Sequence, residues 1–164
     1  MKNRQRLLGA VVAGIAAVAM FPAAASGQAA PKESANVQEL RAIKTAIGKD
    51  SAGLPAAASV KGMELTAVKG IGDDAMAAMM EVDNAIWFVS LYEQMQSEPD
   101  RAAAKAALIN RIHLFRPLLD AQVYQIDESL ALASLPATIQ AGHKLQADLR
   151  AASAELTKIE AGVK

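Results

Sequence analysis

Residues 108–133, LINRIHLFRPLLDAQVYQIDESLALA, carry the strongest pattern in the chain. Apolar residues recur there at steps of four and three: Leu108, Ile112, Phe115, Leu119, Val123, Ile126, Leu130 and Ala133. This spacing places one apolar stripe along one side of an α-helix. Pro117 interrupts the segment, because a proline inside a helix removes a backbone hydrogen bond and crowds the carbonyl of His113. The helix must kink or divide there, and the unchanged phase of the stripe favours a kinked continuous helix.

The segments around this stripe are also helical in pattern, and no segment alternates as a strand does. Helices are predicted over four ranges: 36–47 with Gly48 as terminator, from a cap at Asp73 or Asp74 to Ser97, 100–134, and from Pro136 to the end. The sequence therefore predicts an all-α, elongated up-and-down bundle of three long helices, one of them kinked at Pro117, plus a shorter N-terminal helix. One domain over 36–164 is expected.

The first 25 residues have the three parts of a secretory signal peptide. Lys2, Arg4 and Arg6 precede an apolar run from Leu7 to Phe21, and small residues follow that run. The run has fifteen residues, fewer than the roughly 20 that a membrane-spanning helix needs. We therefore expect residues 1–25 to be removed, residues 26–35 to form a flexible leader, and the protein to be exported to the periplasm or secreted, with no stable transmembrane segment.

The mature chain is expected to be mildly acidic and to contain no disulfide. Removal of the signal peptide leaves 14 basic and 17 acidic residues, a net charge of about −3, and the chain has no cysteine. A lipoprotein anchor is excluded because it requires a cysteine. Stability must then come from packing alone.

The stretch VKGIGDD, residues 68–74, resembles the hairpin of helix-hairpin-helix DNA-binding modules. The residues that match are Leu65, Val68, Gly70, Ile71 and Gly72. The resemblance implies phosphate binding at the turn, but Asp73 and Asp74 stand where that family often has basic residues and would repel a phosphate. The acidic mature chain also lacks a clustered basic surface. We expect no nucleic-acid partner, and interpret the stretch as a glycine turn followed by an aspartate cap.

Motifs of common enzymes are missing from the sequence. Cysteine nucleophiles are excluded, and neither a Gly-x-Ser-x-Gly elbow nor a Ser-x-x-Lys pair occurs. The two histidines, His113 and His143, lack the spacings that place metal ligands on one helical face. Each is interpreted as a solvated residue beside an apolar stripe. The sequence therefore predicts a protein that is not an enzyme and has no cofactor.

The aromatic residues Trp87, Phe88 and Tyr92 form the strongest functional lead. They lie within six positions of one predicted helix that is apolar on all sides. A helical projection places Phe88 and Tyr92 on one side and gathers on the nearly opposite side Met76, Met79, Met80, Ile86, Trp87 and Leu91. Either the short first helix covers the second face, or that face docks a partner with the aromatic residues as anchors. Trp87, Phe88 and Tyr92 are the candidate partner-binding residues.

Met76, Met79 and Met80 suggest an alternative, because thioethers can bind Cu(I) in exported proteins. Methionines at helical spacing also serve as adaptable core filling. The leading hypothesis is an exported, non-enzymatic interaction or structural protein of the bacterial cell envelope that contacts a protein partner. The alternative is a periplasmic binder of copper, haem or a small apolar ligand.

Overall fold

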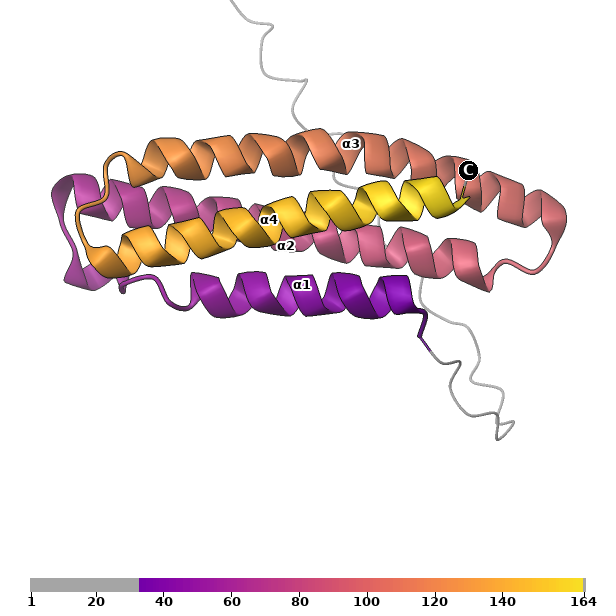
Figure 1. The fold of residues 1–164 in the computed structure, drawn as a ribbon, viewed down its shortest axis with the longest axis horizontal. Helices are drawn as coiled ribbons and strands as arrows, with labels where there is room; N and C mark the ends of the chain where they lie inside the picture. Colours follow the sequence, from indigo (N-terminus) through magenta and orange to yellow (C-terminus); the bar gives the residue numbers. More distant parts are fainter. Residues whose placement is uncertain (1–32, 164) are drawn as a thin grey trace, which may run out of the picture. The chain divides into compact units, whose positions relative to one another are not determined.

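The computed structural model describes residues 33–163, which form a bundle of four α-helices (Figure 1). The predicted signal peptide and residues 26–32 of the predicted leader lie outside these residues. The elements are α1 (Ala35–Ser51), the short 3-10 helix η1 (Ala57–Ser59), α2 (Gly62–Gln94), α3 (Glu98–Leu130) and α4 (Pro136–Val163). No strand occurs between residues 33 and 163. The prediction of an all-α bundle with a shorter N-terminal helix is confirmed.

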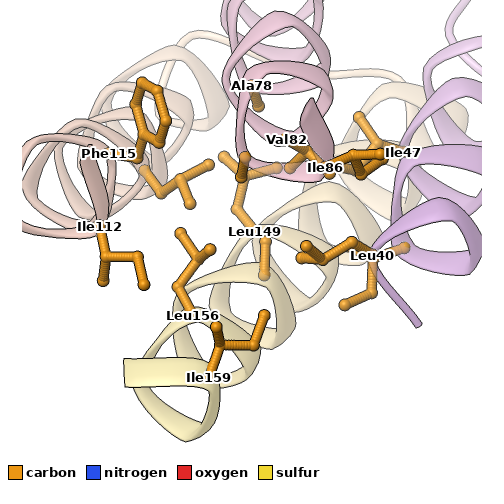
Figure 2. Close-up of a cluster of buried hydrophobic side chains, with 14 of the residues drawn as sticks. Leu40, Ile47, Ala78, Val82, Ile86, Ile112, Phe115, Leu149, Leu156 and Ile159 are labelled. Atoms are coloured by element: carbon orange, nitrogen blue, oxygen red, sulfur yellow. The ribbon is translucent and has the colours of Figure 1, made fainter. Parts of the chain in front are cut away.

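The helices α1 and α3 each contact both α2 and α4, and α2 and α4 also contact each other, less extensively. The helices α2 and α3 have 33 residues each, so each is about 50 Å long. The core between the helices is mainly aliphatic, and Figure 2 shows side chains from all four helices meeting there. Fully buried residues in the predicted stripes of α3 and α4 include Leu108, Ile112, Leu119, Ile126, Leu145 and Leu149.

The helix α3 runs without a break from Glu98 to Leu130, with Pro117 inside it. Figure 1 shows this helix as a gently bowed ribbon. Pro117 is exposed, as are its neighbours Leu114 and Leu118, so its ring faces solvent. A helix that bows outward at a proline tolerates the missing hydrogen bond better than a straight one does. The predicted continuity of the helix across Pro117 is confirmed, and the kink at Pro117 stays a prediction.

The predicted turn at Gly70 and Gly72 is wrong, because both residues lie inside α2. The helix begins at Gly62, whose φ of 60° is readily adopted by glycine. Ile71 is completely buried between the two glycines. A Cβ atom on Gly70 would lie 2.5 Å from Oγ of Ser129 in α3. The glycine therefore permits close packing of α2 on α3, and the hairpin of the DNA-binding modules is not formed.

The predicted end of the first helix at Gly48 is also wrong, because α1 continues to Ser51. The side chain of Ser34 accepts a hydrogen bond from the backbone N of Val37 and caps the helix at its start. Gly48 faces α2, where Sδ of Met79 lies 3.5 Å from the place a Cβ atom would take. That distance is an ordinary van der Waals contact, so the packing of α1 on α2 does not require a glycine here.

Candidate functional site

Three large apolar side chains lie exposed along one face of α2. The exposed fractions are 62% for Met76, 64% for Met80 and 57% for Trp87. Spacings of four and seven residues bring these side chains to the same side of the helix, over a length of about 16 Å. We call Met76, Met80 and Trp87 the outer-face patch.

The structure places these residues differently from the helical projection. The side of α2 that faces the core is lined largely by small residues: Ala67, Val68, Ile71, Ala75, Ala78, Val82, Ala85, Ile86 and Val89. Small side chains let α2 approach its neighbours closely, and the larger Met76, Met80 and Trp87 are left outside. Of the residues grouped together by the projection, Ile86 alone is buried, and Met79 and Leu91 are partly buried.

Phe88 and Tyr92 close the seam between α2 and α3. Both are partly buried and pack against the core cluster. The guanidinium of Arg111 lies 5.2 Å from the centre of the Phe88 ring, and that of Arg101 lies 5.2 Å from the centre of the Tyr92 ring. Such cation–π contacts stabilise the packing of the two helices. These two aromatic residues are therefore less accessible to a partner than Trp87.

Trp87 connects the seam to the outer-face patch. Its ring lies edge-on to Phe88, with 4.7 Å between ring centres. Such an edge-to-face arrangement of two aromatic rings is favourable. Asp83 lies three residues after Met80 and four before Trp87, on the same side of α2, and its Oδ1 lies 2.6 Å from Nζ of Lys44 in α1. The patch thus has two apolar parts, Met76 with Met80 and Trp87 alone, and an ion pair lies between them.

The three methionines of the predicted copper site do not share one environment. Met76 and Met80 are exposed, whereas Met79 packs toward Gly48 of α1. Two thioethers one helical turn apart remain at the surface. Within residues 33–163 no group of three or more His, Cys, Asp or Glu side chains is placed to hold a metal ion.

The two histidines contact polar residues that the sequence did not connect with them. Nε2 of His113 lies 2.9 Å from Oε1 of Glu160, a buried carboxylate of α4. Arg116 donates to the other oxygen of Glu160 at 3.4 Å. Nδ1 of His143 lies 3.3 Å from Oε1 of Gln146. The His113 side chain is 58% exposed, so it remains at the surface as predicted while it also joins α3 to α4.

Sequence reasoning missed Glu64, a buried residue of α2 that binds the start of α4. Its Oε2 accepts hydrogen bonds from the backbone N of Ser134 at 2.6 Å and of Leu135 at 3.1 Å, and Oε1 accepts one from the Thr138 hydroxyl at 2.5 Å. The Thr138 and Ser134 bonds lower the pKa of Glu64 to about 2. These partners are separated by 70 to 74 residues, so no local signal identifies the contact.

No helix in the described part of the chain is long and apolar enough to cross a membrane. No protein-family model matches the sequence, and comparisons with curated proteins and with solved structures found no match.

Proposed function

We propose that this protein is an exported, non-enzymatic interaction or structural protein of the cell envelope, and that the outer-face patch docks a protein partner. The observation that carries the proposal is the exposure of Met76, Met80 and Trp87 on one helical face. Exposed large apolar side chains gathered on one face are unfavourable in water and commonly mark a site of association.

The composition of the patch fits a protein partner. Tryptophan is enriched among the residues that dominate binding energy at interfaces. Methionine side chains adapt to irregular surfaces because they are unbranched and polarisable. The Lys44 and Asp83 pair between Met80 and Trp87 offers polar contacts to a partner. Export is supported by the N-terminal sequence, and the absence of nucleic-acid binding is supported by the acidic balance of the mature chain.

Photo-crosslinking in intact cells tests the docking surface. A photoreactive phenylalanine analogue replaces Met80 in one variant and Met63 in a control variant. Met63 is suitable because it is 69% exposed and belongs to the same helix, yet lies thirteen residues from Met76 and on another side. We expect an adduct of one defined mass from position 80 and none from position 63.

A second substitution tests whether the adduct at position 80 depends on the outer-face patch. Adding Trp87→Asp to the Met80 crosslinking variant should abolish the adduct, because the charge replaces the aromatic anchor. Equal adducts from positions 63 and 80, or an adduct unaffected by Trp87→Asp, would contradict the proposal. Mass spectrometry of the exported protein tests localisation, since cleavage predicts a start near Ser26 or Gln28.

Copper binding is the second candidate function, and it is favoured only by the exposed thioethers of Met76 and Met80. Titration with Cu(I) against a competing chelator tests it, with the double variant Met76→Leu and Met80→Leu as control. Binding that the double variant loses would support a copper site. Haem or an apolar ligand inside the bundle has less support, because aliphatic side chains from all four helices meet at its centre (Figure 2).

A further inference from the structure

The outer side of α3 exposes large uncharged side chains near the middle of the helix. The exposed fractions are 47% for Leu114, 40% for Leu118 and 64% for Tyr124, and Pro117 and Ala121 are exposed as well. Steps of three and four residues place these five side chains on one side of the helix. We call Leu114, Pro117, Leu118, Ala121 and Tyr124 the α3 face. It lies on a different helix from the outer-face patch of α2, and the inference below does not depend on that patch.

The charged residues that flank the α3 face are separated by sign along the helix. Between residues 101 and 116 every Lys, Arg, Asp or Glu residue is basic, and between residues 117 and 130 every one is acidic. The basic residues are Arg101, Lys105, Arg111 and Arg116, and the acidic residues are Asp120, Asp127 and Glu128. The sign therefore changes in the middle of the α3 face, beside Pro117 and Leu118.

This order of charges is complementary to a second copy of the same surface. Two parallel α3 helices would bring like charges together, whereas two antiparallel helices bring the basic half of each onto the acidic half of the other. A twofold axis produces such a pair from one repeated surface. We propose that two copies of this chain form an antiparallel dimer through the α3 face, with the axis close to Leu118.

The apolar side chains meet at the centre of this dimer. With the axis near Leu118, Leu114 of one copy lies opposite Ala121 and beside Tyr124 of the second copy. Their burial supplies the favourable free energy of association, because large apolar side chains leave water. Exposure of Leu114 and Tyr124 in the single chain is then accounted for by the second copy.

The flanking charges determine the orientation of the two helices. Asp120 of one copy lies opposite Arg116 of the second copy, and Glu128 lies within about one helical turn of Lys105 and Arg111. Arg116 also contacts Glu160 within its own chain, which offsets part of its charge. Arg111 is exposed even though its guanidinium lies over the Phe88 ring. The pairing of Arg111 with Glu128 should therefore contribute most to the preference for the antiparallel dimer.

Charge reversal tests the orientation by sedimentation of the exported protein at about 1 to 100 µM, where we expect a wild-type dimer. The double variant Asp120→Lys with Glu128→Lys, and the double variant Lys105→Glu with Arg111→Glu, should each raise the dissociation constant at least about tenfold. An equimolar mixture of the two should dimerise again, because one α3 is then mostly basic and the other mostly acidic.

A matched control carries the same change in charge on other helices. Glu39 of α1 and Glu93 of α2 are exposed, so Glu39→Lys with Glu93→Lys should dimerise as the wild type does. Circular dichroism establishes that each variant is folded. A wild-type protein that stays monomeric over this range, or a mixture of folded variants that does not dimerise, would overturn the proposal.

Disulfide trapping tests the position of the axis without any change of charge. The chain has no cysteine, so Pro117→Cys places a single thiol next to the axis, and mild oxidation should link two copies because the Cα atoms lie within about 7 Å. Ala103→Cys is also exposed on α3 but lies about 22 Å along the helix from Leu118, so it should not link. Equal linking at both positions, which a parallel pair would give, or no linking at position 117, would contradict the antiparallel dimer.

Discussion

Substitution of Gly142 by alanine tests the packing of three helices at one point. A Cβ atom on Gly142 of α4 would lie 2.7 Å from Cδ2 and 3.1 Å from Cγ of Leu130 in α3. It would also lie 3.3 Å from Cδ1 of Ile71 in α2. Because Leu130 is only partly buried, it can shift, and we expect a steric cost of about 1 to 3 kcal/mol.

The helical propensity of alanine works in the opposite direction. Replacing glycine by alanine inside a helix stabilises it by up to about 1 kcal/mol. Gly162 provides a matched control in the same helix, because a Cβ atom there would have no neighbour within 4 Å. We therefore expect Gly162→Ala to be neutral or slightly stabilising and Gly142→Ala to be less stable than it by about 1 to 3 kcal/mol.

Urea unfolding followed by circular dichroism measures both variants. The unfolding midpoint should fall for Gly142→Ala at an unchanged denaturant slope, since the bundle keeps its compactness. If Gly142→Ala proves as stable as Gly162→Ala, the close packing of α4 against Leu130 and Ile71 is refuted.

Three further predictions concern side chains that join the helices. Replacing Phe88 and Tyr92 together by serine should cost several kcal/mol in urea unfolding, because both pack on the core; a change below about 0.5 kcal/mol would mark them as surface residues. Glu64→Gln should lower the free energy of unfolding at neutral pH. Because the pKa of Glu64 in the wild type is lowered to about 2, the difference in stability between variant and wild type should shrink as the pH falls from 4.5 toward 2. A difference in stability that is independent of pH would contradict the role of the charge. Burial and the charge of Asp73 raise the pKa of Asp74 to about 6. Asp74→Asn should therefore add about 1 kcal/mol to the free energy of unfolding above pH 6, after allowance for screening, and nothing below pH 3.8. A gain in stability that persists at low pH in melting experiments would exclude this explanation.

The long helices with strong apolar stripes could be predicted from the sequence. In α3 and α4 large aliphatic residues recur at steps of three and four and also form the core, so pattern and burial agree. Pro117 did not disturb the prediction because the stripe keeps its phase across it.

The start and orientation of α2 could not be predicted in the same way. Gly70, Gly72 and Asp73 are local turn signals, but the burial of Ile71 and the close approach of Ser129 favour a continuous helix. The core side of α2 is marked by alanines, whereas the projection gave weight to larger residues. A projection that counted Ala75 and Ala78 as core positions would have placed the methionines and Trp87 outside.

The polar contacts between helices could not be predicted from the sequence. Glu64 and Thr138 are neighbours only because α2 and α4 pack together. The same holds for Glu81 and Gln122, which join α2 to α3 at 3.1 Å. Such partners depend on the register of the helices, which periodicity alone does not determine.

Thiol labelling inside cells tests the docking role of the outer-face patch most directly. The chain has no cysteine, so a Met80→Cys variant carries a single reactive thiol, and a Met63→Cys variant serves as its control. A small maleimide should label both variants equally fast in the purified protein, because both positions are exposed. In intact cells we expect labelling of Met80→Cys to slow at least tenfold while labelling of Met63→Cys is unchanged, since a bound partner covers only the patch. Equal labelling of the two variants in cells would contradict the proposed interface.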